Sequence, residues 1–305
     1  MIKPNLDERN PFLKWGLIET RGDKKGLPKI SATSFNMWAE SPSAWISKYI
    51  LKVDQEPNVA MHRGTTAEKV LYNVLIGHSK FDDIEKEAEA TFRQRTTMLG
   101  TEEEKIKEIK DLVGYKTYGA KRKDGTKPIK NEYKGFIKNA YDRLKVFGKP
   151  ESYQQRVWFK LPQFEVFADG YKDFGYEDFD LDLKTTSKMS GALPLAYRRQ
   201  LTLYRMQSNK DQKLLLATKD KAELYVLEDS YNQSKEEIND IINTMAVALT
   251  ECNSVEELLL RYYPNWENWK LSIKQKEELR QVLRKTHDNN YWRERQDLQE
   301  LQRGV

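Results

Sequence analysis

Three charged side chains in one short region have the types and spacing of a hydrolytic metal site. Asp182 and Lys184 stand two residues apart in the segment DLDLKTT, and Asp173 ends the preceding alternating segment. Side chains two apart on a strand point to the same side, so Asp182 and Lys184 share one face. If the chain turns near 175–177 and the strands are staggered or bulged, Asp173 lies close to Asp182. Two adjacent carboxylates repel, and a hard cation such as Mg²⁺ or Mn²⁺ between them removes that repulsion.

Such an ion would lower the pKa of a bound water and stabilise charge on a phosphoryl oxygen. Lys184 would orient that water or neutralise the developing charge. The simpler alternative is a salt-bridged surface hairpin, because 32% of the residues are charged and D-x-K triplets are common by chance in such a chain. Other motifs in the sequence are needed to distinguish the metal site from the surface hairpin.

The surrounding pattern predicts a mixed α/β fold in which helices pack on a sheet. Apolar residues recur at helical spacing over 61–77, and three alternating segments between 152 and 186 predict consecutive antiparallel strands. An amphipathic helix over 194–208, two further strands and a helical C-terminal region follow. The core order is therefore helix, three strands, helix, strand.

The sequence predicts a single domain over residues 1–305, with three parts outside its core. We expect a loose polar arm over 1–30, a charged helical insertion over 82–150, and a C-terminal helical extension over 231–303. Between the arm and the core, Ser31 or a nearby hydroxyl residue caps a helix that Ser41-Pro42 ends.

Composition excludes several kinds of site. Cys252 is the only cysteine, so no intramolecular disulfide, four-thiolate zinc site or four-cysteine iron–sulfur cluster can form, and only three histidines are present. No apolar run approaches the roughly 18 residues of a membrane span, and the N-terminus lacks a signal-peptide pattern. No G-x-x-x-x-G-K-[ST] motif is present, so we expect no bound nucleotide. The net charge of +5 is compatible with a nucleic-acid partner, and we expect a cytoplasmic protein without a membrane partner.

Five motifs occur in an order that resembles the RecB-like branch of the PD-(D/E)XK nucleases. They are SATSFNMWAESPSAWISKYI, RGTTAEKVL, GYKDF, DLDLKTTSK and QLTLYR, and they lie within residues 30–227. Each is weak alone, but five in this order on matching elements form a specific signal. The resemblance, which is to single-domain phage-type or mitochondrial genome maintenance exonucleases, implies a PD-(D/E)XK core (αβββαβ) whose central mixed sheet is flanked by helices.

The resemblance implies metal ligands at matching positions. Glu68, four residues after a glycine on a helix, matches the first ligand, where many RecB-like members carry histidine. Asp173, three residues after a glycine on a strand, matches the second, and Asp169 is its rival because some phage exonucleases place the ligand directly before the glycine. Asp182 matches the third ligand, and the backbone carbonyl of Leu183 would join it. Lys184 matches the catalytic lysine of the family.

Other positions match parts of the family that approach DNA. Gln200 and Tyr204 fit its Q-x-x-x-Y helix and share one helix face, so Gln200 would reach the active site or the DNA backbone and Tyr204 would support it. Helix capping is the simpler role for the serines of the first motif, and we favour it slightly over DNA contact. The remaining candidates for DNA contact are Ser31, Ser34, Arg63, Thr185 and Thr186.

The resemblance implies a metal-dependent deoxyribonuclease that serves recombination, repair or genome processing. We expect Mg²⁺ as cofactor with Mn²⁺ as a substitute, no iron–sulfur cluster, and DNA ends, single-stranded ones included, as substrate. An exonuclease is the preferred mode. A helicase or a single-strand annealing or binding protein would be a separate chain, and a phage-encoded enzyme would act in the host cytoplasm.

Three alternatives stay open at this point. A flap or structure-specific endonuclease would use the same metal site, and so would an RNA nuclease, because the choice of sugar depends on contacts that the motifs do not contain. A non-catalytic DNA-binding subunit could keep the fold, although Glu68, Asp173, Asp182 and Lys184 are all present and favour an active enzyme.

Overall fold

The chain forms two compact units in the computed structural model. The terminal unit comprises Met1–Gln55, Trp158–Asp169 and Glu236–Val305, and the central unit comprises Glu56–Val157 and Gly170–Lys235. This division differs from the single domain that the sequence predicted. The structure describes residues 10–53, 59–84, 86–88, 90–91, 132–227, 231–268 and 271–286.

The strands form a mixed sheet, as predicted. Among the described residues the sheet has six strands in the order β1-β3-β4-β5-β6, with β2 also paired to β3. β3 and β4 are antiparallel, β4 and β5 parallel, and β5 and β6 antiparallel, while β1 runs parallel to β3. The strands are β1 (Lys29–Ser31), β2 (Ser152–Leu161), β3 (Val166–Gly175), β4 (Phe179–Thr185), β5 (Asp211–Ala217) and β6 (Ala222–Val226).

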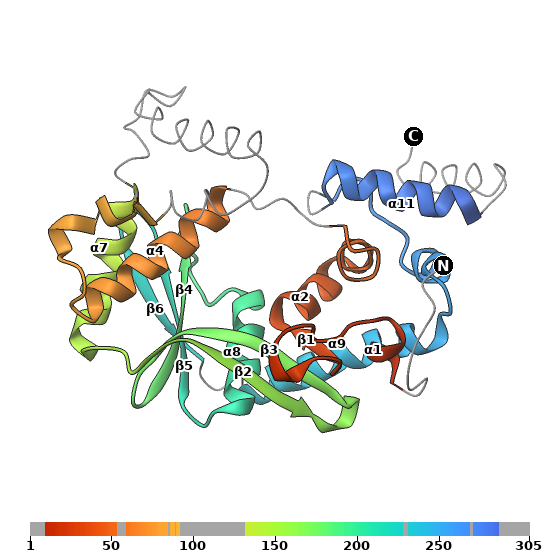
Figure 1. Ribbon diagram of the computed structural model, residues 1–305, viewed down its shortest axis with the longest axis horizontal. Helices are drawn as coiled ribbons and strands as arrows, with labels where there is room; N and C mark the ends of the chain where they lie inside the picture. The colour runs from red at the N-terminus through yellow and green to blue at the C-terminus, as the bar shows by residue number, and fades with distance from the viewer. Residues whose placement is uncertain are drawn as a thin grey trace. The chain divides into compact units, whose positions relative to one another are not determined.

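Helices cover both faces of the sheet in the central unit (Figure 1). Helices α4 (Val59–Leu75) and α7 (Glu132–Leu144) pack on the face that carries Leu215 of β5, whereas α8 (Leu195–Gln207) packs on the face that carries Leu214. Neighbouring residues of a strand point to opposite faces, so β5 is buried on both sides. A parallel pair such as β4 and β5 commonly has this double cover.

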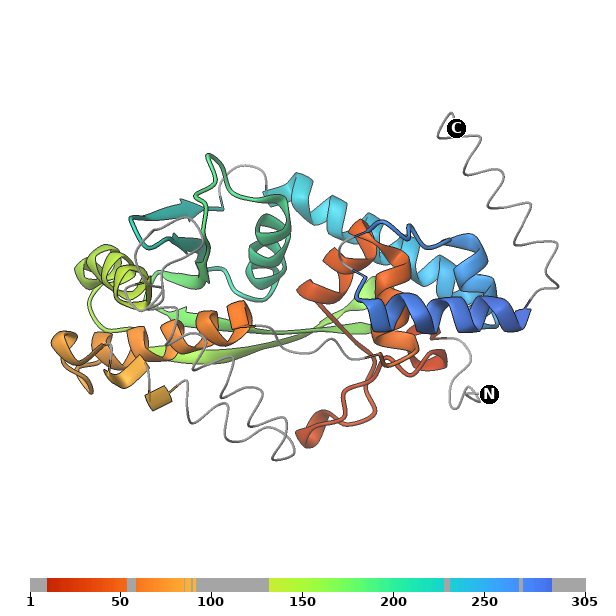
Figure 2. The ribbon, with the colours of Figure 1, turned by 90° about the horizontal axis from the view of Figure 1, so that it is seen from above.

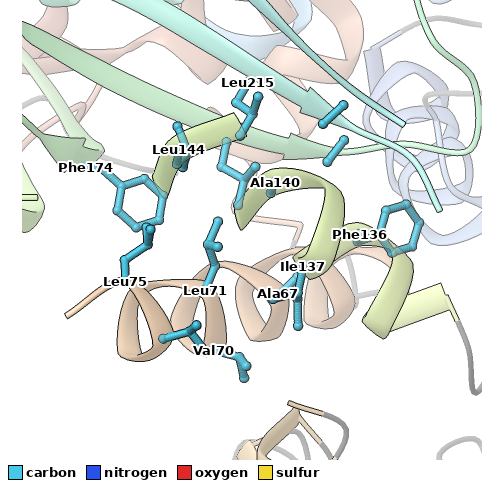
Figure 3. Packing of buried hydrophobic residues seen from close by; sticks show 14 of the residues in the cluster. Ala67, Val70, Leu71, Leu75, Phe136, Ile137, Ala140, Leu144, Phe174 and Leu215 are labelled. Atoms are coloured by element: carbon cyan, nitrogen blue, oxygen red, sulfur yellow. The ribbon is translucent and has the colours of Figure 1, made fainter. Parts of the chain in front are cut away.

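Helix α7 belongs to the core, which corrects the prediction that residues 82–150 form an insertion outside it. Phe136, Ile137, Ala140 and Leu144 form an apolar stripe that is 2% exposed or less, and it packs against α4. Figure 3 shows Leu71 of α4 pointing toward Ala140. The many charges of this helix hid the stripe, because they occupy the opposite face. Residues 92–131 of the predicted insertion lie outside the described residues.

In the terminal unit, described segments from the N-terminal and C-terminal parts of the sequence pack together (Figure 2). Residues 10–30 are not a loose arm: Asn10 caps α1 (Pro11–Lys14), Phe12 is fully buried, and the Trp15 indole donates to the carbonyl of Leu249. The predicted break at Ser41-Pro42 is confirmed, since it separates α2 (Ala32–Glu40) from α3 (Pro42–Trp45), which continues as a π-helical turn (Ile46–Ile50). The C-terminal helices are α9 (Tyr231–Glu251), α10 (Val255–Arg261) and α11 (Ile273–Thr286).

Short 3-10 turns complete the described elements, at Gly22–Lys24, Phe81–Asp83, Lys145–Phe147 and Pro162–Phe164. No helix in the described part of the chain is both long and apolar enough to cross a bilayer.

Gly135 permits the close approach of α7 to the turn between β5 and β6. A Cβ there would lie 2.3 Å from the carbonyl oxygen of Lys219, so we predict that Gly135→Ala destabilises the protein by about 1–3 kcal/mol even though alanine is the better helix former. Gly64→Ala is the matched control in α4, because its Cβ would meet only Thr185 Oγ1 at an ordinary 3.6 Å. Urea unfolding of both variants measures the difference, and equal stabilities would contradict the prediction.

Candidate active site

The site begins where β3 and β4 separate. Their antiparallel register pairs Gly175 with Asp180 and Phe174 with Leu181. At the next position Asp173 Oδ2 accepts a hydrogen bond of 2.8 Å from the backbone N–H of Leu183. The Asp173 carboxyl group thus accepts the Leu183 N–H, which a backbone carbonyl of a neighbouring strand would otherwise accept. The Asp173 carboxyl group is therefore fixed inside the sheet.

Asp173 and Asp182 are both buried, at 6% and 2% exposure. Burial raises the pKa of Asp173 well above its usual value, and the negative charge of Asp182 raises it further. The Lys184 ammonium and the hydrogen bond from Leu183 oppose this shift without cancelling it. The direction of this effect is that expected of two carboxylates that repel each other.

Glu68 approaches the pair from α4. It is 8% exposed, and burial raises its pKa, while hydrogen bonds from Gln154 and Tyr153 act in the opposite direction. The Gln154 amide nitrogen donates both to Glu68 Oε1 and to Asp173 Oδ1, the latter at 3.1 Å. The first carboxylate that the motifs predicted is thus joined to the second through one side chain.

Lys184 lies on the same side of β4 as Asp182, as the alternation predicted. Its Nζ forms an ion pair with Asp182 Oδ2, and its side chain is 29% exposed while that of Asp182 is 2% exposed. Burial acts to lower the pKa of Lys184, but the charges of Asp182 and Asp173 outweigh it and raise that pKa. The ammonium therefore stays protonated in this arrangement and faces the buried acids as a fixed positive charge.

Gln200 and Tyr204 hold Asp182 from the side of α8. Gln200 Nε2 donates to Asp182 Oδ1 and to the Tyr204 hydroxyl, both at 2.9 Å. Tyr204 is 4% exposed, and its ring lies so close to β3 that a Cβ on Gly170 would come within 2.9 Å of Tyr204 Cε1. The glycine of GYKDF therefore makes room for the tyrosine of QLTLYR, and the tyrosine positions the glutamine.

The acidic side chains of the site supply oxygen donors, but they do not converge on one point. Among the described residues no three Asp, Glu, His or Cys side chains lie close enough together to hold a metal ion. Their oxygens meet internal donors instead, namely Gln154, Gln200, Lys184 and the N–H of Leu183. Oxygen donors with unfavourable buried charge suit Mg²⁺ or Mn²⁺. By the chemistry of their oxygens, Glu68, Asp173 and Asp182 would suit such an ion.

Two other acidic residues of this region have partners of their own. Asp169, the rival ligand, lies in the terminal unit and forms a 3.2 Å ion pair with Lys29. Asp180 accepts from Lys172 at 2.8 Å and from Gln212 at 2.9 Å, and all three side chains are buried. These contacts leave Glu68, Asp173 and Asp182 as the carboxylates gathered at the separating strands.

The candidates for DNA contact lie in different environments. Ser31 caps α2 by accepting from the Ser34 N–H at 3.1 Å, which is the capping role that the sequence favoured. Ser34 lies inside α2 and is not a cap; its Oγ accepts from the Trp45 indole at 2.8 Å. Thr185 ends β4, and the Thr186 hydroxyl bonds the backbone of Lys188. The side chain of Arg63 lies outside the described residues.

Sequence reasoning missed Gln154. Its segment YQQRVWFKLP reads as an ordinary alternating strand, and neither glutamine in it stands out. The feature that singles Gln154 out is a backbone φ of +51° inside β2, together with contacts to residues distant in sequence. No pattern in the local sequence carries that information.

Comparison with known proteins finds similarity to solved structures but not to sequences. No protein-family model matches the chain, and no curated protein sequence matches it either. The fold is similar to the crystal structure of a candidate exonuclease from Eubacterium rectale, with 13% sequence identity and a TM-score of 0.44. The similarity covers 73% of this chain and 81% of that protein. What the site does must therefore be derived from its own side chains.

Proposed function

We propose that the protein is a metal-dependent nuclease that hydrolyses phosphodiester bonds in DNA. One observation carries the proposal: three buried carboxylates, Glu68, Asp173 and Asp182, gather beside Lys184 where two strands separate. Isolated buried carboxylates are costly, so a cluster of three with a partly exposed lysine calls for a functional explanation.

Glu68, Asp173 and Asp182 would hold the ion, with the carbonyl of Leu183 as a further ligand. When bound, Mg²⁺ or Mn²⁺ supplies charge stabilisation for a phosphoryl oxygen and a water of lowered pKa. Lys184 acts as a positive charge, because the neighbouring acids raise its pKa and keep it protonated. It therefore stabilises negative charge on the phosphate or donates a proton, and it is poorly suited to act as a base.

Gln200 orients Asp182 rather than reacting itself. Its two amide hydrogens are committed to Asp182 and to the Tyr204 hydroxyl. Tyr204 in turn is fixed by its close packing on Gly170. This chain of contacts holds Asp182 Oδ1, while Oδ2 forms the ion pair with Lys184.

The finer assignment rests on the motif resemblance. It supports an exonuclease of the RecB-like branch that acts on DNA ends in recombination or repair, in a phage or a related genetic element. It also supports a cytoplasmic site of action and a helicase or single-strand annealing protein as a separate partner. Thr185 ends β4 and Thr186 follows it, and both would lie near the scissile phosphate.

Asp182→Asn and Lys184→Ala should each lower metal-dependent DNA hydrolysis by about 10²-fold or more, because each removes a charge that the transition state needs. Purified protein is incubated with end-labelled linear and circular DNA, in single- and double-stranded form, with Mg²⁺, Mn²⁺ or EDTA. Loss of linear DNA alone supports the exonuclease, and cleavage of circles indicates an endonuclease.

Matched controls lie on the same elements. Asp178→Asn changes an exposed acid of the same hairpin, and Lys188→Ala changes an exposed lysine just after β4, so both should keep full activity. DNA that is bound but never cut with any metal would contradict the catalytic proposal and favour a binding subunit. Cleavage of RNA in preference to DNA would contradict the substrate assignment.

The metal-free protein should become less stable as the pH rises, and bound metal should offset that loss. The folded-state pKa values of Asp173 and Glu68 are raised, so their protonated forms stabilise the metal-free protein at low pH. That stabilisation is lost as the pH rises from the ordinary carboxyl value of about 4 through the raised values. Metal binds the ionised carboxylates, so the gain in Tm from Mg²⁺ should grow over the same interval.

Thermal unfolding in EDTA and in MgCl2 between about pH 5 and 9 measures this effect. In EDTA, Asp173→Asn should flatten the fall of stability with pH, because the most strongly shifted group is gone. A gain in Tm from Mg²⁺ that stays constant across the range would contradict the metal assignment to these carboxylates.

A further inference from the structure

Gln154 contacts two of the three acidic side chains at once. Its amide nitrogen donates to Asp173 Oδ1 at 3.1 Å and to Glu68 Oε1. A side-chain amide has two N–H donors, and here each meets a different carboxylate. Both acceptors are buried, so these bonds lie in a region of low dielectric where hydrogen bonds are stronger than in water.

The backbone of Gln154 is held in an uncommon conformation to make these bonds. Its φ of +51° lies in the left-handed region, and within the described residues it is the one non-glycine residue inside a strand with positive φ. This region is unfavourable for residues with a Cβ and is typically retained where the surrounding structure requires it. In this conformation the side chain contacts both Glu68 and Asp173.

The amide compensates the acids as a cation would, but without net charge. Its hydrogens carry partial positive charge and reduce the repulsion between the two carboxylates. Those hydrogens and a bound cation repel each other, so both cannot occupy the space between the same two oxygens. An ion held by Glu68 and Asp173 therefore requires the amide to turn or withdraw.

We propose that Gln154 is a positioning residue that holds Glu68 and Asp173 in place in the metal-free protein and gives up both hydrogen bonds when a divalent cation binds. The inference rests on the proposed metal-dependent function. Its consequence is a coupling: the bonds stabilise the metal-free state, so they lower the apparent affinity for the ion. The protein would thus keep a formed site without metal, at some loss of metal affinity.

Gln154→Leu tests the coupling, because leucine is close in shape but has no donor. The measurements are Tm in EDTA and in saturating MgCl2, and the Kd for Mn²⁺ by calorimetry. We expect Tm to fall by about 5 °C in EDTA and by clearly less in MgCl2, and Mn²⁺ to bind about tenfold more tightly. Gln155→Leu, on the exposed neighbour in β2, should change none of these values.

A second variant keeps the test decisive if Gln154→Leu does not fold. Gln154→Gly removes the amide and also relieves the positive φ, so it should lose less stability than Gln154→Ala while still binding Mn²⁺ more tightly than the wild type. Gly and Ala at this position differ chiefly in backbone strain, so their difference in Tm measures the cost of the left-handed conformation.

Two outcomes would overturn the inference. Weaker Mn²⁺ binding in Gln154→Leu would mean that the amide oxygen is itself a metal ligand. Equal losses of Tm with and without Mg²⁺ would mean that Gln154 has only a structural role. Failure of the proposed function looks different, because the wild type would then bind neither Mn²⁺ nor Mg²⁺, before any variant is compared.

Discussion

The site depends on the placement of two carboxylates inside a sheet, where the strands that carry them separate. Asp173 accepts the N–H of Leu183, and this hydrogen bond fixes Asp173 at the point where regular pairing of β3 with β4 ends. Burial of Asp173 next to Asp182 is unfavourable, as the raised pKa of Asp173 records. A fold retains buried carboxylates when neighbouring groups offset their charge. The surrounding residues supply such groups.

Each compensating group comes from a different element of the central unit. Lys184 lies on β4 itself, Gln200 reaches Asp182 from α8, and Gln154 joins Asp173 to Glu68 from β2. The two-sided cover of the sheet makes this possible, because α4 delivers Glu68 while α8 delivers Gln200. The neighbouring Asp180 shows the contrast: its Oδ2 accepts from two buried partners, Lys172 and Gln212, and the residue belongs to the structure of the sheet.

Much of this arrangement was predictable because it follows from local periodicity. Alternation of apolar and polar residues located β2, β3 and β4, and spacing of two placed Lys184 on the face of Asp182. The spacing of four in Q-x-x-x-Y placed Gln200 beside Tyr204. These relations depend on residues within a few positions of one another, and secondary structure alone fixes them.

The features that escaped prediction depend on contacts between distant segments. α7 looked like an insertion because charged residues are interspersed with its apolar ones, and only packing against α4 reveals its buried stripe. The N-terminal residues looked loose because their partners, such as Leu249, lie more than 200 positions away. Gln154 depends on both a left-handed backbone and acceptors on two other elements, which a single strand pattern cannot encode.

The position of a bound ion tests the central claim most directly. Crystals of the protein soaked in MnCl2 and measured at a wavelength where manganese scatters anomalously would locate the ion without reference to activity. We predict an anomalous peak contacted by Asp173, Asp182 and Glu68, with the Gln154 amide turned away from the carboxylates. A peak elsewhere, or none at these residues under saturating MnCl2, would contradict the assignment of this cluster as a metal-dependent catalytic site.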